Sequence, residues 1–285
     1  MDTTVTPSRQ ALEIDAARNL PALPAAVLEL LDMLGRDDVE THALAAKISL
    51  DPALAAKTLR LANSSFYGMA RHVTSLSEAA SVLGLRTVRT VVTTAALTGS
   101  IAAPVCEGFD FNAFWRHAVS AAVGSKLVAI ATGVDSEAAF TAGLLHDIGR
   151  LVLAAGFPQR YEEVLAHGDA RGIELGDREH QLLGIDHAAV GALVAEHWRF
   201  PEPIVDAIAG HHALPTGADA VTLTQVVHLA DHLLHALELG TCVDNDLPAS
   251  CLPAWLSTHL SAECRMHLLV ETELQAGAIC AALLH

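Results

Sequence analysis

The sequence predicts an all-α protein, and three observations support this fold class. Apolar residues recur at spacings of three and four along most of the chain, as in the segment AAVLELLDML that follows Pro24. Helix-capping residues stand directly before such segments, for example Asp51 before PALAAKTLRLA. The Val/Thr-rich run at 87–94 has neither an alternating pattern nor a hairpin turn, so no strand is predicted there.

The first third of the chain is expected to form a series of helices. Pro24 fits the first position of the first helix, because that position needs no main-chain N–H. Residues 40–62 form two expected helices joined by a short turn at 49–51. Ser75 or Ser77 caps the next helix, and residues 86–97 continue as a mostly buried helix.

The segment APVCEGFDF (103–111), with Pro104 and Gly108, is expected to link two helical subdomains. Residues 240–253 are loop-like. These breaks divide the chain into an N-terminal subdomain (1–105), a second helical subdomain (106–239) and a C-terminal helical extension (240–285) that caps the bundle or mediates oligomerisation. After the linker, helices are expected at 111–131, 136–154, 173–183, 186–198, 201–212, 219–238 and 262–283.

The composition excludes several classes of protein. The 285 residues are 52% hydrophobic and only 18% charged, which excludes a disordered chain. The first residues lack the apolar segment of a secretory signal, and the longest uncharged run, 90–106, is too short and polar to cross a membrane. Five cysteines without a CxxC pair form neither a disulfide framework nor a thiolate zinc site. We therefore expect a cytoplasmic protein.

The charge of −16 is unevenly distributed. Residues 41–90 carry six basic and two acidic residues, whereas the segments on either side are strongly acidic. This basic island is either a solvated helix surface or a patch for an anionic partner. The candidate patch consists of Lys47, Lys57, Arg60, Arg86 and Arg89.

The helix pair at 40–62 lies in the basic island and resembles a helix-turn-helix. Its second helix, however, presents mostly Ala and Leu and offers few side chains that read bases. Nucleic acid is therefore not the expected partner.

Histidines and aspartates with metal-ligand chemistry are spread over the second subdomain. Imidazole and carboxylate are good ligands for Fe, Mn, Zn or Ni, and a carboxylate next to a histidine can bridge two ions. In the segment AFTAGLLHDIGRLVLA (139–154), the His146-Asp147 doublet lies in an apolar helix, where a buried Asp needs a compensating partner. The alternative is a His–Asp hydrogen bond with surface histidines elsewhere. The candidate ligands are His117, His146, Asp147, His187, His211, His212 and Asp231.

Several segments together resemble the HDOD domains of the HD superfamily. AGLLHDIGRL (142–151) is similar to the HD signature, and FWRHAVSAA (114–122) to the helix that precedes it. LLGIDHAAVGALVAEHWRFPEPIVDAIAGHH (182–212) and VVHLADHLLHAL (226–237) are similar to the HDOD segments that follow. In the N-terminal half, LPALPAAVLELL, ISLDPALAAKTLRLANSSFYG and VTSLSEAASVLGLRTVRTVV are similar to the HDOD pattern. The likeness covers about Leu20 to Leu237.

The resemblance implies an N-terminal helical bundle packed on an HD-type bundle. It also implies a bacterial regulatory protein that signals through protein partners in trans. Carried over by motif, the seven candidate ligands would form a two-metal HD site. Because the whole length is taken up by the HDOD likeness and the extension, the signal is expected to come from a partner or from a nucleotide-type ligand.

The resemblance also implies an alternative, a metal-dependent phosphohydrolase acting on a nucleotide or cyclic dinucleotide. Asp147 would then belong to the catalytic centre, and Arg150 and Lys126 would neutralise phosphate charge. The sequence departs from the HD-GYP phosphodiesterases after the paired histidines, where it reads Ala213-Leu214-Pro215. Ala113 also stands where three-metal members carry Glu. The missing GYP segment argues against cyclic di-GMP hydrolysis and says less about metal binding.

Overall fold

The protein is described from a computed structural model. The described parts are residue 29 and residues 41–68, 72–100, 103–166, 175–213, 221–238 and 262–283. The described residues form helices and connecting turns without a strand, so the predicted all-α fold is confirmed. Apart from residue 29, the helix predicted after Pro24 lies outside the described residues, as does the loop predicted at 240–253.

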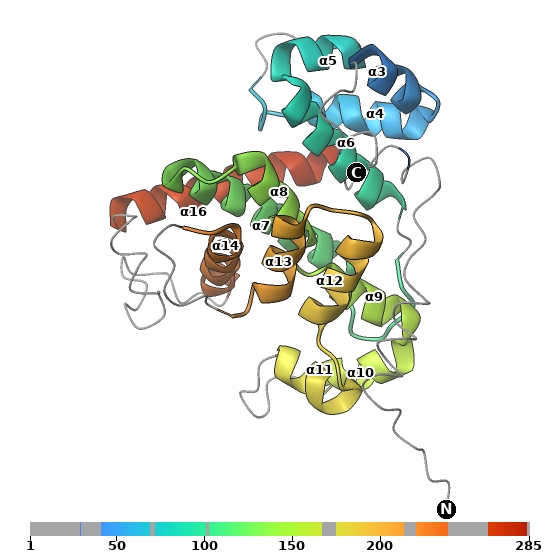
Figure 1. The fold of residues 1–285 in the computed structure, drawn as a ribbon, viewed down its shortest axis with the longest axis vertical. Helices are drawn as coiled ribbons and strands as arrows, with labels where there is room; N and C mark the ends of the chain where they lie inside the picture. The colour runs from blue at the N-terminus through green and yellow to red at the C-terminus, as the bar shows by residue number, and fades with distance from the viewer. Residues whose placement is uncertain are drawn as a thin grey trace, which may run out of the picture.

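The helices form two groups (Figure 1). The upper group contains the N-terminal helices α3 (Thr41–Ser49), α4 (Pro52–Ala62), α5 (Leu76–Leu83) and α6 (Leu85–Ser100). The lower and larger group contains α7 (Phe111–Thr132), α8 (Ser136–Leu145), α9 (Ile148–Gly156), α10 (Pro158–Ala166), α11 (Leu175–Leu183), α12 (His187–His197), α13 (Glu202–Gly210) and α14 (Leu223–Glu238). The C-terminal helix α16 (Ala262–Leu283) packs on both α7 and α4 and so contacts both groups.

The predicted caps of the N-terminal helices are confirmed. The Asp51 carboxylate accepts hydrogen bonds from the N–H groups of Ala53 and Leu54, and Pro52 occupies the first turn of α4. Ser75, rather than Ser77, caps α5 by accepting from the N–H of Glu78. The turn predicted at 49–51 joins α3 to α4.

The prediction of one helix over 136–154 is wrong in detail, because the His146-Asp147 doublet separates α8 from α9. The Gly143 carbonyl accepts a hydrogen bond from His146 Nδ1 at 2.7 Å. That ring competes with the main-chain N–H of residue 147 for the same oxygen, which weakens the helical ladder at this point. The helix α10 was not predicted, and it begins at Pro158 directly after α9.

A continuous hydrophobic core joins the two groups of helices. One cluster of buried apolar side chains extends from Leu44 in α3 through Trp115 and Leu151 to Leu283 in α16. A smaller cluster lies between α7, α14 and α16. The larger group of helices is therefore packed directly against the N-terminal helices.

Two glycines allow α9 and α12 to pack unusually closely. A Cβ atom at Gly149 would lie 1.9 Å from the carbonyl oxygen of His187 and 2.8 Å from the main-chain N of Gly191. No side chain fits at that distance, so the glycine in HDIG is required by packing. The close approach brings the start of α12, and with it His187, next to the His146-Asp147 doublet.

The segment Ser136–Gly156 is apolar enough to be considered as a membrane span, with a mean hydropathy of 1.3. In the structure 83% of its apolar 18-residue window is buried inside the protein. This stretch is therefore part of the buried core of the helical protein.

Candidate metal centre

The seven predicted ligands come from five parts of the HD-type bundle, and the structure brings all of them together. His117 lies in the second turn of α7 and Asp231 in the middle of α14. The other ligands stand at helix ends: the His146-Asp147 doublet between α8 and α9, His187 at the first position of α12, and the pair His211-His212 directly after α13.

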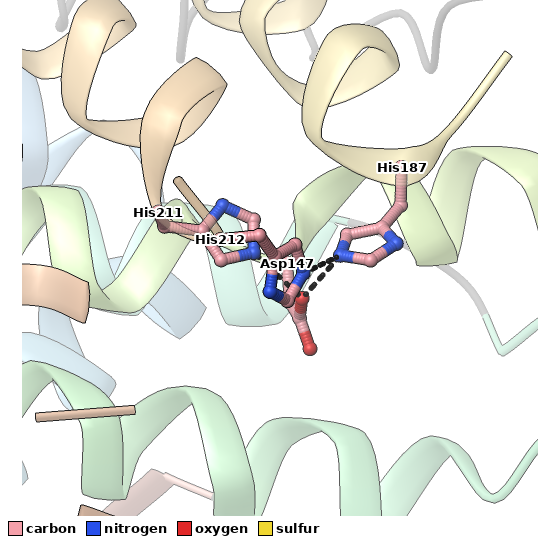
Figure 2. Close-up of side chains that lie close together, drawn as sticks. All are labelled: Asp147, His187, His211 and His212. Atoms are coloured by element: carbon pink, nitrogen blue, oxygen red, sulfur yellow. Dashed lines mark hydrogen bonds and ion pairs between the residues drawn. The ribbon is translucent and has the colours of Figure 1, made fainter. Parts of the chain in front are cut away.

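Asp147 lies at the centre of the first group of ligands, which we call subsite B: Asp147, His187, His211 and His212. Figure 2 shows the three rings directed toward the Asp147 carboxylate from α12 and from the end of α13. Asp147 Oδ1 lies 3.3 Å from His187 Nε2 and 3.7 Å from His211 Nε2. His212 completes the group, with Nε2 2.7 Å from His187 Nε2.

The second group, subsite A, contains His117, His146 and Asp231 and shares Asp147 with subsite B. His117 Nε2 lies 3.1 Å from Asp231 Oδ1 and 3.3 Å from His146 Nε2. The Asp147 oxygens lie 3.7 Å from His146 Nε2 and 3.9 Å from His117 Nε2. Asp147 therefore contacts both groups, as expected of a bridging carboxylate.

Main-chain carbonyls orient two of the buried imidazoles. His146 Nδ1 donates to the Gly143 carbonyl, and His211 Nδ1 donates to the Ile208 carbonyl, both at 2.7 Å. Because a carbonyl only accepts, Nδ1 of each ring carries the hydrogen and Nε2 keeps its lone pair. The lone pairs therefore face the cluster, which is the orientation that a hydrogen bond from the other ring nitrogen gives to metal-binding histidines.

The electrostatics favour ionised aspartates and lower the pKa of the two adjacent histidines His211 and His212. Burial disfavours the charged form of Asp147, but His146 and Arg150 outweigh it and hold the pKa of this carboxyl well below its usual range. Burial likewise opposes charge on Asp231, whose pKa is held low by hydrogen bonds from His117 and His146. Desolvation and the neighbouring histidines lower the pKa of His212 to about 3.

The residues present fit a pair of transition-metal ions. His211 Nε2 is buried and makes no hydrogen bond within the described part of the chain, so it has a lone pair that a cation could use. Imidazole nitrogens and carboxylate oxygens suit Fe, Mn, Zn or Ni, and no thiolate stands among the seven ligands. The geometry therefore gives each subsite three side chains of its own and a share of Asp147.

The two cations predicted to contact phosphate have other partners. Arg150 Nη1 donates to Asp147 Oδ2 at 2.7 Å, and its guanidinium also interacts with Tyr161. Lys126 Nζ donates to Glu137 at 2.7 Å and lies 5.4 Å from the centre of the Phe66 ring. Lys126 is nine residues beyond His117 on α7, roughly 13 Å along the helix axis. The structure therefore brings Arg150 to the centre and leaves Lys126 away from it.

The predicted basic patch is partly neutralised. Lys47 is paired with Glu29, and Arg86 with Asp135 at the start of α8. Lys57 and Arg60 lie together on α4, where partial burial and then Arg60 lower the pKa of Lys57. The side chain of Arg89, the fifth member of the patch, lies outside the described residues.

Sequence reasoning missed three side chains that surround the centre. Glu179 on α11 accepts from His187 Nδ1 at 2.5 Å, and Tyr161 on α10 donates to Glu179 at 2.8 Å. Burial lowers the pKa of His187, but Glu179 outweighs it and the pKa is raised. His235 lies 3.1 Å from Asp231 Oδ1. His235 follows Asp231 by four residues on one helix, and this spacing could have predicted their contact. No pattern of neighbouring residues predicts that Glu179 contacts His187.

Comparisons with known proteins identify the family and the fold. The HDOD domain family matches residues 20–214. An uncharacterized protein of Treponema pallidum (strain Nichols) is 29% identical over 216 residues, which are 74% of this chain and 41% of that protein. The chain thus spans about two fifths of the length of this curated relative.

Solved structures share the fold. A protein of Shewanella amazonensis SB2B, provisionally named a phosphohydrolase, is 29% identical with a TM-score of 0.81 over 96% of this chain and 98% of that chain. An HDOD domain protein of unknown function from Geobacter sulfurreducens is 24% identical with a TM-score of 0.73, over 96% and 97% of the two chains. With the family match over more than half of its length, this chain belongs to the HDOD family of the HD superfamily.

Proposed function

We propose that this protein is a cytoplasmic signal-transduction regulator that acts through protein partners and retains a two-metal HD centre. The observation that carries the proposal is that the seven residues form two adjoining groups joined by Asp147, which contacts histidines of both. His117, His146 and Asp231 would hold one ion, and His187, His211 and His212 the other, with Asp147 shared between them. The metal is Fe, Mn, Zn or Ni by the chemistry of the ligands.

The surroundings of the centre favour regulation over catalysis. Arg and Lys side chains beside the metals commonly help to stabilise the charge of a transferring phosphoryl group. Arg150 is already held by Asp147, and Lys126 by Glu137. The chain as a whole carries a charge of −16, which repels anionic substrates at long range.

A metal-dependent phosphohydrolase is the second candidate. It is supported by the shared Asp147 and by the provisional name of the Shewanella amazonensis relative. Bound divalent ions would supply Lewis acidity and a metal-activated water for attack on a phosphate ester. Asp147 would then orient the centre, and Arg150 would contact phosphate only after leaving its present partner.

Metal analysis of the purified full chain tests the shared core of both candidates. We expect about two ions per chain by elemental analysis, as in other two-metal sites. The variant His146→Ala/Asp147→Ala should lose both ions, because it removes one ligand of subsite A and the shared carboxylate. The control His180→Ala changes an exposed histidine of α11 and should keep both. A chain without bound metal after growth and titration with these metals would contradict the proposed centre.

An activity screen separates the two candidates. Bis(p-nitrophenyl) phosphate and cyclic dinucleotides are suitable probes, because both are phosphodiesters. A metal-loaded chain that turns over neither supports the regulator. Metal-dependent turnover that disappears in His146→Ala/Asp147→Ala supports the phosphohydrolase, and turnover that survives in this variant would exclude the site proposed here.

A further inference from the structure

Glu179 is a fully buried carboxylate whose two oxygens both accept hydrogen bonds. Its side chain has no exposed surface. Oε1 accepts from the Tyr161 hydroxyl at 2.8 Å. Oε2 accepts from the main-chain N–H of His187 at 2.7 Å and from Nδ1 of the same residue at 2.5 Å. A buried charge of this kind is tolerated only with such a complete set of partners.

The hydrogen bonds of Glu179 are part of a closed ring of contacts around subsite B. Tyr161 also interacts with the Arg150 guanidinium. Arg150 in turn donates to Asp147 Oδ2 at 2.7 Å, and Asp147 Oδ1 lies 3.3 Å from His187 Nε2. Two members of this ring, Asp147 and His187, are ligands of subsite B. The ring joins α9, α10, α11 and α12, which are four separate helices of the bundle.

We propose that Glu179 is a positioning residue that selects the metal-binding tautomer and orientation of His187, and thereby controls the affinity of subsite B. This inference rests on the proposed metal centre. Glu179 does not reach the ions itself, because its oxygens are occupied by His187 and Tyr161. It holds the hydrogen of His187 on Nδ1 and leaves the lone pair of Nε2 directed at Asp147.

The contact of Glu179 with the main chain fixes the position of His187 more firmly than a single hydrogen bond to its ring would. His187 is the first residue of α12, so its N–H has no partner within the helix. One oxygen of Glu179 binds both this N–H and the ring of the same residue. The backbone and the side chain of His187 are therefore oriented by one group.

Subsite A has no contact of this kind with Glu179. The ring of His146 is oriented by the Gly143 carbonyl, and Asp231 receives a contact from His235. A change at Glu179 should therefore affect the two subsites unequally. This inequality separates a positioning role from a general contribution to folding.

The variant Glu179→Gln tests the inference. An amide has only one acceptor oxygen, so one of the present donors would face an NH₂ group. Titration of the metal-free full chain with Mn²⁺ should show two ions bound by the unmodified protein. In Glu179→Gln one ion should keep its affinity and the other should bind about 10- to 100-fold more weakly, the usual effect of losing an outer-shell partner. The electron paramagnetic resonance signal of a coupled Mn²⁺ pair should disappear at low Mn²⁺ concentration.

Two further variants complete the test. Tyr161→Phe removes one hydroxyl and should weaken the same ion by a smaller factor, even if Glu179→Gln folds poorly. Glu162→Gln is the matched control on α10, where the carboxylate accepts, among the described residues, from the N–H of Glu107 and an amide oxygen can replace it. The inference, but not the metal centre, would be overturned by either of two results. One is that both ions bind with unchanged affinity in Glu179→Gln and in Tyr161→Phe. The other is that both ions bind more weakly by the same factor. An unmodified protein that binds no Mn²⁺ would overturn the metal centre together with the inference.

Discussion

Asp147 is the residue that joins the two subsites. One of its oxygens lies within 3.7 Å of two subsite B histidines, and the carboxylate also contacts His146 and His117 of subsite A. Its low pKa keeps the carboxyl ionised. Most other candidate ligands belong to only one subsite. A single substitution should therefore remove either one ion or both, depending on the residue.

We expect Asp147→Asn to lose both ions and His212→Ala to lose only one. The amide removes the charge and one ligand oxygen shared by both groups, whereas His212 belongs only to subsite B. Elemental analysis of the purified variants measures this directly. Asp110→Asn is the control, because Asn caps the N-terminus of α7 as well as Asp does. Equal metal contents in Asp147→Asn and His212→Ala would contradict a bridging role.

At the scale of the helices, the contact between α9 and α12 positions the centre. The main chains approach at Gly149, where an added Cβ would overlap the carbonyl of His187. The same contact places His187 beside Asp147. The stability of the protein and the position of His187 therefore both depend on Gly149.

We expect Gly149→Ala to lower the free energy of unfolding by about 3 kcal/mol or more, because overpacking a core contact forces the helices apart. Gly277→Ala is the contrasting variant on α16, where an added Cβ meets nothing within 4 Å. It should raise the free energy of unfolding by about 0.5–1 kcal/mol, the difference in helix propensity. Urea denaturation measures both. A Gly149→Ala protein as stable as the unmodified one would show that α9 and α12 separate freely.

Asp135 caps α8 and pairs with Arg86 of α6, so it links the two groups of helices. Partial burial raises its pKa, but hydrogen bonds from the Ala138 N–H and Arg86 outweigh it, and the pKa lies below the usual 3.8. A carboxyl with a lowered pKa stabilises the folded state above its unfolded pKa and loses that effect as the pH falls.

Asp135→Asn should isolate the charge of this residue, because Asn keeps the cap. We expect it to be less stable than the unmodified protein above about pH 4, by under about 1 kcal/mol, since the pair is exposed to solvent. The difference should shrink as the pH falls below 3.8 and also in 1 M salt. Thermal unfolding from pH 3 to 7 checks this, and a difference that grows toward pH 3 would contradict the low pKa.

At the scale of the whole molecule, a polar contact lies inside the junction between the N-terminal helices and the HD-type bundle. Lys126 of α7 and Thr90 of α6 both donate to Glu137 of α8, and Lys126 stands over the ring of Phe66. The lysine that the sequence suggested for phosphate binding therefore holds the two groups of helices together.

We expect Glu137→Ala to destabilise the protein by about 2 kcal/mol, because the Lys126 charge would remain partly buried without its partner. Lys126→Met/Glu137→Gln should recover most of this loss, since it leaves no unpaired charge. Urea unfolding of the single and double variants gives the coupling between the two residues. A double variant no more stable than Glu137→Ala would exclude an important ion pair.

Particular residues show how far the sequence predicted the site. The caps Asp51 and Ser75 follow from neighbours in the chain, although the sequence left Ser77 open as an alternative to Ser75. The seven residues that meet in the structure were expected from the resemblance to HDOD domains. The break of the helix at His146-Asp147 was not predicted, since it depends on a ring that reaches back to Gly143. Glu179 was missed for a different reason: its significance comes only from its contacts with α10 and α12.

The sequence by itself determined the helical fold, the helix caps, the chemical types of the ligands and the family to which the chain belongs. Only the tertiary structure decided that residues as distant as His117 and Asp231, 114 positions apart, lie 3.1 Å from each other. It also decided that Arg150 and Lys126 are held by carboxylates rather than free for phosphate. The physical reason is the distance along the chain over which each feature is determined. Helix patterns arise from contacts three and four residues apart, whereas a metal centre requires side chains from five parts of the chain to meet through packing.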